Sequence, residues 1–589
     1  AFVATHELEI RRNQIYGYDW NDYYETHVAV LFRIGIDPTG GTDHTSPNIV
    51  WSAPVYTRQK GRPYIPISVS APVTPGQAAT VFVRGIDNTI QKHLQIPLFI
   101  DDVWAGFSPG VEVPTVTVTK NDPLSVTFSW TTSLPTTSMI QHTWDGSSTL
   151  FPNSWFYYDD KLKTNHSVTI SNRFIPDLDQ RFCVQSLSGL GWSITPLQTF
   201  KTDPINTIYN GDFEASGLAW DQELGFGMGA IPWVKFGSAT GIARDGTYPM
   251  HGIVSYSPTH SLIFEEGYSN AMNYGGAYQR IKVGTENVGQ TYMVFAKALT
   301  WCEGQLSDVS NRIGIDPTGG TNPGDSKVVW GPWVSTNRTW QDALCSAIAG
   351  EGATNWDGYL TVFLQTEHRW GLPLNLTMFD DVAFQLAVPK TTLGDALKAP
   401  VGWPVDLGAS GNGMIVTKIE LLTEQTGIFK YAWIQGDDRT NGIKVRLDKL
   451  ANADQIDRGC RVRVKGNTNV AGLVDPNWGE AEIVALKMDV LSSGNDDPIP
   501  LDMPNKTLSG AAVGIQRAAA GASGASNIGL LVKTTGRVVE VATDGFTGKE
   551  YFLIDDGSAL QTPIHPPYGS DYVATGLKVY NPDDFPVNP

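Results

Sequence analysis

Short runs in which apolar and polar residues alternate recur along the whole chain, separated by clusters of Gly, Pro, Asn and Asp. Residues 124–130, 166–170 and 359–364 show this pattern clearly. Because successive side chains of a strand point to opposite faces, the alternation predicts half-buried β-strands joined by turns. The one Ala-rich run, residues 518–525, is interrupted by glycines, which disfavours a helix there. The pattern therefore predicts an all-β fold.

One internal repeat organises these predicted strands. The ten residues 33–42 recur unchanged as residues 312–321, an offset of 279. The same offset, without any insertion, superposes three further positions: Trp51 on Trp330, Asp101 on Asp380 and Asp102 on Asp381. Identity over such a stretch predicts two copies of one domain. The repeated Asp-Pro-Thr-Gly-Gly segment has the residues of a turn and predicts an exposed loop.

The ends of the second copy carry two motifs. It opens with Tyr-Asn-Gly-Asp-Phe-Glu at 209–214 and closes with Phe-Asp-Asp-Val-Ala-Phe at 379–384. These motifs resemble the first and last strands of bacterial carbohydrate-binding modules, which are jelly-roll β-sandwiches. Arg312 lies 102 residues after Asn210, whereas Arg33 lies 32 residues after Ala1. We therefore expect the first copy to lack about 70 residues of its start.

Two other domain types are indicated by resemblance. Residues 110–204 resemble a fibronectin type III sandwich, with Trp130 as the buried tryptophan and Phe182 in place of the corner tyrosine. The strand and turn order after residue 412 resembles bacterial OB-fold barrels. A weaker second copy of this barrel begins at Leu530, after an Ala/Gly/Ser-rich connector whose composition is typical of flexible linkers.

The chain is thus predicted to be a series of β-sandwiches, jelly-roll and fibronectin III-like, followed by OB-like β-barrels. We expect five segments: a partial jelly-roll at 1–109, a fibronectin type III-like domain at 110–204, the second jelly-roll at 205–388, a linker with an OB-like barrel at 389–494, and a linker with a partial second barrel at 495–589.

Composition narrows the expected partners and location. The 589 residues carry a formal net charge of −18. A nucleic-acid binder needs basic surface to neutralise phosphate, so nucleic acid is not the expected partner. No run of 18 apolar residues occurs, so no membrane span is predicted. We expect a secreted or cell-surface protein. Cys302 and Cys345 lie in one predicted domain, where they either pair or remain buried thiols.

Calcium is implied by the resemblance to carbohydrate-binding modules. In those modules, oxygens from the opening and closing strands hold a structural Ca²⁺. Asp212, Glu214 and Asp380 stand at the matching positions, and hard carboxylate oxygens suit Ca²⁺. The alternative is that these carboxylates cap strand ends or face solvent.

The two copies also separate core aromatics from candidates for sugar binding. Trp51 and Trp330 match, so both are expected to pack in the core. Five aromatic residues of the second copy align with non-aromatic residues of the first copy: Trp333, Trp340, Trp356, Tyr359 and Trp370. A fold that forms without these rings does not need them for its core. They are our candidates for a face that binds polysaccharide or a cell-surface glycan, because aromatic rings stack on the apolar face of a sugar. The alternatives are different loop packing or contact with a partner protein.

No catalytic arrangement is recognisable. Adjacent carboxylates such as Asp380 and Asp381 point to opposite faces of a strand and do not form an acid/base couple. The chain lacks a Gly-x-Ser-x-Gly elbow, a His-Glu-x-x-His motif and a phosphate-binding Gly loop. We therefore do not expect an enzyme. A basic stripe in the first barrel, Arg446, Arg461, Arg463 and Lys465, is the one feature that favours nucleic acid.

Three functions follow, in order of preference. The first is a non-catalytic extracellular or cell-surface structural protein that binds glycan, or that self-associates into a fibre or surface layer. The second is an accessory carbohydrate-binding region of a larger polysaccharide-degrading enzyme. The third is nucleic-acid binding by the OB-like barrels.

Overall fold

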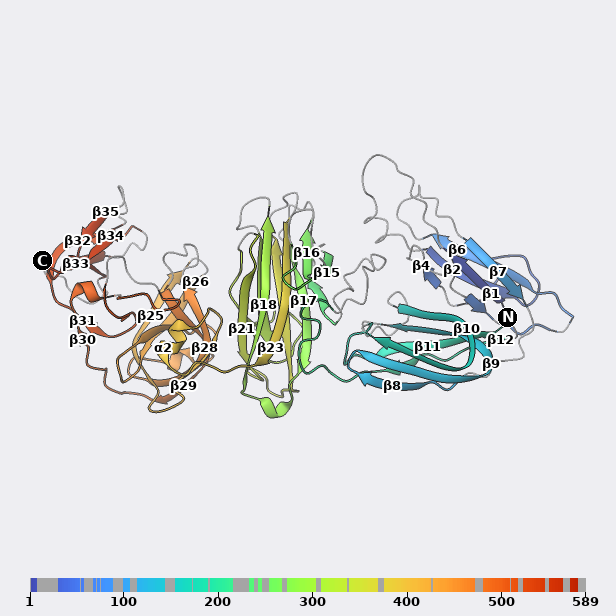
Figure 1. Ribbon diagram of the computed structural model, residues 1–589, viewed down its shortest axis with the longest axis horizontal. Helices are drawn as coiled ribbons and strands as arrows, with labels where there is room; N and C mark the ends of the chain where they lie inside the picture. The colour runs from blue at the N-terminus through green and yellow to red at the C-terminus, as the bar shows by residue number, and fades with distance from the viewer. Residues whose placement is uncertain are drawn as a thin grey trace.

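A computed structural model shows an elongated row of β-domains, with the N-terminus and the C-terminus at opposite ends (Figure 1). It describes residues 2–7, 30–52, 55–57, 67–69, 71–74, 76–87, 99–105, 114–143, 154–171, 173–188, 191–214, 232–237, 242–245, 254–266, 273–302, 309–335, 338–368, 375–424, 427–471, 480–508, 510–516, 523–545, 550–564 and 572–580. Strands dominate these ranges, which confirms the all-β prediction. No helix in the described ranges is long and apolar enough to span a membrane.

The second copy of the repeat is a sandwich of two antiparallel five-stranded sheets. We call β14-β17-β22-β19-β20 the front sheet and β15-β16-β23-β18-β21 the back sheet. The front strands are β14 (Val234–Gly237), β17 (Asn273–Lys282), β22 (Tyr359–His368), β19 (Val309–Asp316) and β20 (Val329–Trp330). The back strands are β15 (Ile242–Asp245), β16 (Leu262–Glu266), β23 (Asn375–Leu386), β18 (Thr291–Cys302) and β21 (Gln341–Ile348).

The core of this sandwich lies between the two sheets. Alternate residues of each central strand point inward, for example Ile313 and Ile315 from the front sheet and Val294 and Ala296 from the back sheet. Burial of these apolar side chains is the main source of stability of such a domain. The residues between them point to the two outer faces, which are the surfaces available for function.

The first copy repeats part of this architecture. Its strands are β1 (Phe2–Glu7), β2 (Val30–Asp37), β3 (Val50–Trp51), β4 (Val55–Thr57), β5 (Ile67–Val69), β6 (Thr80–Asp87) and β7 (Phe99–Ala105). At the offset of 279, β2, β3 and β7 fall on β19, β20 and β23. The strand β1 lies between β5 and β7, as β18 lies between β21 and β23. Both pairs carry a register shift at the same place, directly after Asp101 in one and directly after Asp380 in the other.

The repeated Asp-Pro-Thr-Gly-Gly turn is less exposed than its composition predicts. Asp37 and Asp316 are both buried. Each carboxylate accepts hydrogen bonds from the backbone N–H and the hydroxyl of the threonine two residues later, at 2.6–2.8 Å in each copy. A short polar side chain that bonds its own turn in this way stabilises the turn. The repeated aspartate therefore fixes the loop from within the structure.

Two long strands that pair along most of their length dominate the segment predicted to be fibronectin III-like. Its strands are β8 (Thr117–Asp122), β9 (Ser125–Thr143), β10 (Ser154–Ser171), β11 (Gln180–Ser188), β12 (Gly191–Ile194) and β13 (Gln198–Phe200). β8 pairs with the first half of β9, and β11 pairs with the second half. Trp130 is buried: its ring stacks on His166 with centroids 4.7 Å apart, and its Nε1 donates to Ser186 Oγ at 2.9 Å.

The next domain is a closed barrel. Its strands are β24 (Pro404–Leu407), β25 (Met414–Glu424), β26 (Gly427–Gln435), β27 (Gly442–Arg446), β28 (Arg461–Ala471) and β29 (Glu480–Ser492), preceded by the short helix α2 (Leu393–Lys398). The order β25-β26-β27-β29-β28 closes on β25, with β27 and β29 parallel. This barrel, predicted to be OB-like, encloses its own apolar core.

The C-terminal segment forms smaller sheets. Its strands are β30 (Leu501–Asp502), β31 (Val532–Lys533), β32 (Arg537–Thr543), β33 (Glu550–Asp555), β34 (Gln561–Ile564), β35 (Tyr572–Thr575) and β36 (Leu577–Tyr580). The sheet β32-β33-β36 follows the order of the first three barrel strands, β25-β26-β27.

The back sheet of the second sandwich contacts the barrel directly. Its outer residues Met293 and Leu344 pack in one cluster with Trp403, which belongs to the barrel segment. Ser346 of β21 hydrogen-bonds Asn467 of β28, and the Asn467 amide donates to the Ser346 carbonyl at 2.8 Å. Both side chains are buried, so this polar contact is shielded from water. Sandwich and barrel therefore share a packed interface.

The four cysteines are buried thiols. Cys345 pairs with Val294 across β21 and β18, whereas Cys302 lies eight residues further along β18. At about 3.4 Å per residue this separation is far beyond the reach of a disulfide. The alternative that Cys302 and Cys345 are bonded is therefore wrong.

A charged cluster joins the fibronectin III-like sandwich to the second jelly-roll. Asp177 accepts a hydrogen bond from Tyr359 Oη at 2.5 Å. It also forms an ion pair with Lys201 at 2.8 Å and lies 3.8 Å from Arg280. The Arg280 guanidinium stacks on the Tyr359 ring at 3.7 Å and pairs with Asp357 at 2.7 Å. Burial raises the pKa of Asp177, but hydrogen bonds from Lys201 and Tyr359 outweigh it and hold that pKa below its usual value.

The variant Asp177→Asn tests whether this cluster sets the angle between the two domains. Asn tolerates the left-handed backbone of this position, φ 60°, so the loop is kept while the charge is lost. We expect small-angle X-ray scattering of the variant to report a wider spread of interdomain distances. Asp179→Asn, on the same loop and exposed, is the matched control. Identical scattering profiles for wild type and Asp177→Asn would contradict the assignment.

Candidate functional site

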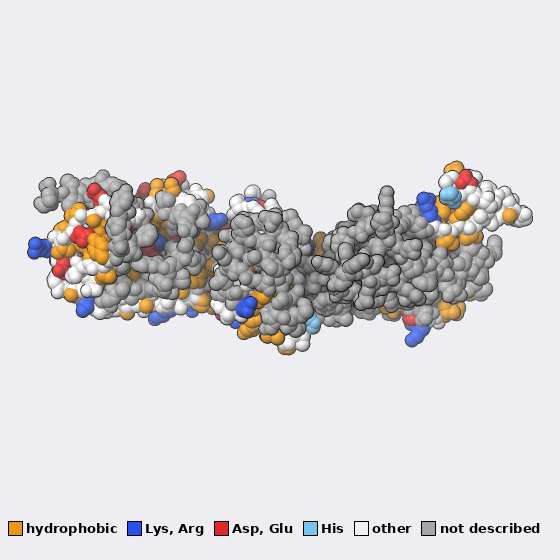
Figure 2. All heavy atoms as spheres, turned by 90° about the horizontal axis from the view of Figure 1, so that it is seen from above, with side chains coloured by type: hydrophobic (Ala, Val, Ile, Leu, Met, Phe, Trp, Pro, Cys, Tyr) orange, Lys and Arg blue, Asp and Glu red, His pale blue; other side chains and the backbone are white. Residues whose placement is uncertain are grey.

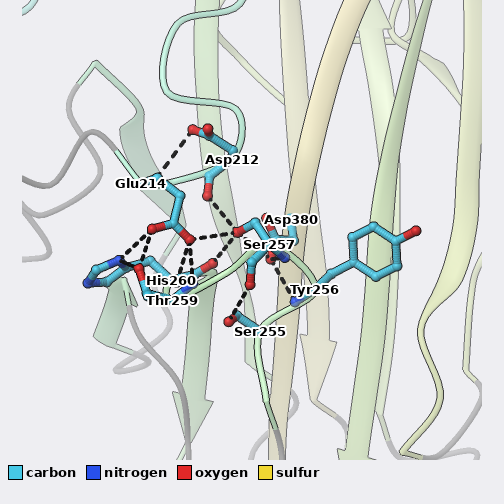
Figure 3. A network of polar contacts seen from close by, with 8 residues as sticks. All are labelled: Asp212, Glu214, Ser255, Tyr256, Ser257, Thr259, His260 and Asp380. Carbon is cyan, nitrogen blue, oxygen red and sulfur yellow. Dashed lines mark hydrogen bonds and ion pairs between the residues drawn. The ribbon is translucent and has the colours of Figure 1, made fainter.

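A network of carboxylates holds the loop 254–260 in place (Figure 3). Asp380 Oδ2 accepts hydrogen bonds from the backbone N–H groups of Tyr256 at 2.9 Å and Ser257 at 2.8 Å. Glu214 Oε1 accepts from those of Thr259 at 2.7 Å and His260 at 2.8 Å. Ser257 Oγ stands between the carboxylates, 3.0 Å from Glu214 and 3.1 Å from Asp380. Four N–H groups of one loop are thus fixed by two side chains.

The two carboxylates come from the opening and closing segments of the sandwich, which run side by side. Val382 N donates to Gly211 O at 2.8 Å. A Cβ on Gly211 would lie 2.0 Å from the carbonyl oxygen of Val382, so only glycine fits there. Asp380 immediately precedes the register shift of β23, which falls at Asp381 and Val382, and Asp381 has φ 48°. This strained backbone turns Asp380 toward the loop while Asp381 faces solvent.

Burial and hydrogen bonding act in opposite directions on the two carboxyl groups. Burial dominates at Asp380 and raises its pKa, against the hydrogen bonds from Ser257 and its neighbours. At Glu214 burial also raises the pKa. Hydrogen bonds from the side chains and backbone of Thr259 and His260 together outweigh burial and hold that pKa far below its usual value. Glu214 is therefore ionised over the whole neutral range.

Asp212, Glu214 and Asp380, the predicted calcium ligands, do meet in this network, since Asp212 O accepts from Ser257 Oγ at 3.0 Å. The groups around the carboxylates, however, are N–H and O–H donors, whose positive ends occupy the directions a cation needs. In the part of the chain that the structure describes, no group of three or more His, Cys, Asp or Glu side chains could hold a metal ion. As folded, this donor set does not fit Ca²⁺.

A second concentration of functional groups covers the outer face of the front sheet. Phe363 lies at its centre and is fully buried. Its ring centroid is 5.7 Å from that of Phe236, 5.8 Å from that of Tyr278 and 5.8 Å from that of Trp330. These rings sit on the side of the sheet opposite the core. Gly314 leaves room for Trp330, because a Cβ there would lie 2.5 Å from the indole ring.

Arg312 is held between two indole rings on this face. Its Cζ lies 4.2 Å from the centroid of Trp330 and 4.1 Å from that of Trp333. Contact with both rings holds the guanidinium group in place. Burial lowers the Arg312 pKa to about 10, so the group remains protonated at neutral pH. Arg312 Nε donates to Gln365 Oε1 at 2.6 Å.

This bond fixes the orientation of the Gln365 amide. Arginine has only donors, so Oε1 must face Arg312 and Nε2 must face away. Among the residues that the structure describes, buried Nε2 has no hydrogen-bond partner, and neither does buried Thr361 Oγ1, four residues earlier on the same strand face. An unpaired buried polar group costs free energy unless a ligand or water pairs it. The face therefore combines aromatic surface with fixed, unsatisfied hydrogen-bonding groups.

The structure distributes the five predicted sugar-binding aromatics over different places. Trp333 stacks on Arg312. Trp340 packs on the outer cluster of the back sheet, and its Nε1 donates to Val254 O at 3.2 Å. Trp356 packs against the core, and its Nε1 donates to Tyr359 O at 2.7 Å. Tyr359 is largely buried against Asp177 and Arg280 at the domain junction. Trp370 lies outside the described residues.

Several residues of the front face were missed by comparing the two copies. That comparison assigned Trp51 and Trp330 to the core because they match. In both copies the tryptophan instead lies on the outer face beside an arginine, with Arg33 Cζ 4.4 Å from the Trp51 ring. The alternation of inward and outward residues along the strand could have revealed them. Because Ile313 and Ile315 point inward, Arg312 and Gly314 point outward.

The basic stripe of the barrel is neutralised by neighbouring carboxylates. Arg446 pairs with Asp448 at 2.9 Å, Arg461 with Asp437 at 2.7 Å, and Arg463 with Asp406 at 2.6 Å. Lys465 Nζ also lies 4.0 Å from Asp406. On the described part of the face drawn in Figure 2, Lys and Arg side chains stand singly among acidic and apolar ones. A phosphate backbone would have to displace these pairs, which disfavours nucleic-acid binding.

Some solved structures resemble part of this chain. No family model matches the chain, and no curated protein matches it. Among solved structures, promiscuous carbohydrate-binding modules of the β-sandwich superfamily are 14% identical, cover 47% of this chain and 100% of their own, and give a TM-score of 0.19. A xylan-binding domain of family 22 is 15% identical and covers 31% and 95%, with a TM-score of 0.20. A cyclase from Fischerella is 12% identical and covers 32% and 99%, with a TM-score of 0.23.

The variant Glu214→Gln tests the carboxylate network by its pH dependence. Because the folded pKa of Glu214 lies below the unfolded value of about 4.5, its stabilisation is present above pH 4.5 and is lost as the pH falls. At pH 7 we expect the variant to lose about 1–3 kcal/mol in urea unfolding, a difference that shrinks at pH 3. Asp212→Asn is the control, since its carboxylate receives one hydrogen bond, from Glu214 N at 3.3 Å. A pH-independent difference would contradict the account.

Chelation tests the calcium prediction. Because N–H donors already surround the carboxylates, EDTA should leave the melting transitions of the chain unchanged. Differential scanning calorimetry with EDTA, and with added Ca²⁺ or Mg²⁺, measures this. A fall of more than about 4 °C in EDTA, reversed by Ca²⁺ alone, would show that the network rearranges around a calcium ion.

Proposed function

We propose that this chain is a non-catalytic, extracellular or cell-surface β-protein whose second jelly-roll binds glycan on the outer face of its front sheet. The observation that carries this proposal is Arg312, stacked between Trp330 and Trp333 and bonded to Gln365. Sugar-binding faces combine flat aromatic surface for the C–H face of a pyranose with a few fixed polar groups for its hydroxyls. This face offers both.

The polar groups of the face suit hydroxyl-rich ligands. Gln365 Nε2 is an unpaired donor, and Thr361 Oγ1 can donate or accept. Both side chains are fully buried, so a sugar hydroxyl would reach them only after the side chains that cover them move aside. Glu367 lies two residues beyond Gln365 and faces the same side of the sheet, which adds an acceptor near Arg312. A sugar hydroxyl both donates and accepts, so one ring can pair with groups of both kinds. Rigid side chains lose little conformational entropy on binding, which favours affinity.

The arrangement of the domains supports a scaffold. The second sandwich is tied to the fibronectin III-like domain through Asp177 and to the barrel through Asn467. Such contacts hold a binding face at a fixed distance from its neighbours. Self-association into a fibre or surface layer remains part of the proposal, as does the alternative of an accessory region of a larger polysaccharide-degrading enzyme. Nucleic-acid binding is the least favoured, because the basic stripe is paired with Asp437, Asp448 and Asp406.

Affinity electrophoresis in gels that contain soluble xylan, mixed-linkage β-glucan or glucomannan tests the proposal. We expect wild type to be retarded by at least one polymer. Arg312→Leu should weaken binding about tenfold or more, equal to about 1.4 kcal/mol, because it removes the stacked donor.

The first copy supplies a matched control. Arg33→Leu removes the equivalent stacked arginine, but there the counterparts of Trp333 and Gln365 are Pro54 and Ile86. We expect it to leave retardation unchanged. Equal losses in both variants would point to a general charge effect, and no loss in Arg312→Leu would overturn the proposed face.

A further inference from the structure

We propose a second glycan-contact surface on the opposite side of the sandwich, where the clamped loop 254–260 presents Tyr256 over the outer face of the back sheet. Its ligand class is a neutral pyranose of a polysaccharide chain. The proposal rests on the glycan-binding function proposed above, but it uses none of the residues of the front face.

Tyr256 is an exposed aromatic residue on a loop that is held rigidly. The residue retains 49% of its accessible surface in the folded chain. Its own N–H and that of Ser257 are bound by Asp380, and the residues that follow are bound by Glu214. Figure 3 shows the tyrosine ring pointing away from this network. A large exposed ring needs no carboxylate clamp for stability, whereas a binding surface gains affinity when its aromatic group is already fixed.

The surroundings of Tyr256 complete a small surface. The Trp340 ring lies 5.9 Å from it in an edge-on arrangement, and Trp340 Nε1 donates to Val254 O of the same loop. Lys297 Nζ, from the outer side of β18, lies 4.6 Å from the tyrosine ring centroid. Asp342, opposite Lys297 on β21, accepts from it at 2.6 Å. Trp340 was predicted to bind sugar, and the structure places its ring beside that of Tyr256.

The charges of this surface favour a neutral ligand. Lys297 and Asp342 cancel each other, and both are partly exposed, at 26% and 68%. A cation and a carboxylate side by side offer a donor and an acceptor to neighbouring hydroxyls, while neither an acidic nor a basic sugar gains a net attraction. The aromatic rings beside the pair match the apolar C–H face of a pyranose.

Two surfaces on opposite outer faces give the domain a capacity that one surface lacks. The front and back sheets pack face to face over a common core. Arg312, on the outer face of the front sheet, and Tyr256, over the outer face of the back sheet, therefore point away from each other. One domain could then contact two polysaccharide chains and cross-link them. On a single long chain or a dense network, the second contact would raise the apparent affinity through effective concentration.

The test compares Tyr256→Ala, Arg312→Leu and the double variant with wild type, in gels of soluble xylan, mixed-linkage β-glucan and glucomannan. We expect Tyr256→Ala to weaken retardation at least threefold, Tyr256→Phe to retain it, and the double variant to lose it. Tyr157→Ala, an exposed tyrosine of the fibronectin III-like domain, is the control and should behave as wild type. Light scattering of protein–polymer mixtures should show cross-linking by wild type and by neither single variant.

The outcomes separate the two proposals. Retardation of Tyr256→Ala equal to wild type, with loss in Arg312→Leu, would overturn the second surface and keep the front face. Loss in Tyr256→Ala with none in Arg312→Leu would support the second surface and overturn the front face. Wild type that is retarded in none of the three gels would overturn both. Equal melting transitions for all variants would exclude unfolding as the cause of any loss.

Discussion

The packing of two five-stranded sheets over one core constrains everything else in the second sandwich. Each central strand must give every second residue to that core, as Ile313, Ile315, Leu360 and Leu364 do. The intervening residues do not contribute to that core. Aromatic residues at those positions, such as Trp330 and Phe363, therefore are not required by the core itself, and their presence on an outer face needs another explanation. The proposed glycan binding supplies one, because it uses flat apolar rings and polar groups together.

The carboxylate network shows how the ends of the sandwich are joined. Glu214 belongs to the opening segment and Asp380 to the closing strand, and both bind one loop between them in sequence. Positive φ angles at Asn210, Phe213 and Asp381 mark the same region. Strain of this kind persists only where the surroundings fix it. The network therefore stabilises the domain and also sets the position of a loop that carries an exposed tyrosine.

The all-β fold and the repeat could be predicted because they depend on local signals. Alternation in residues 359–364 and identity of 33–42 with 312–321 need no knowledge of long-range contacts. The meeting of Glu214 with Asp380 was accessible through motif resemblance, but the donors that surround them were not, since loop 254–260 carries no motif. Trp356 and Tyr359 look like surface aromatics in sequence, yet one packs on the core and the other meets Asp177 from a different domain. Contacts between domains leave no periodic trace in sequence.

The central claim is that the second sandwich works through the outer face of its front sheet. The most direct measurement is the response of the tryptophan indole N–H signals, observed by NMR in ¹⁵N-tryptophan-labelled protein, to xylohexaose or cellohexaose. The account predicts that the signals of Trp330 and Trp333 shift in a saturable manner, while those of the buried Trp130 and Trp233 stay in place. Saturable shifts confined to other tryptophans, or none at millimolar oligosaccharide, would contradict it.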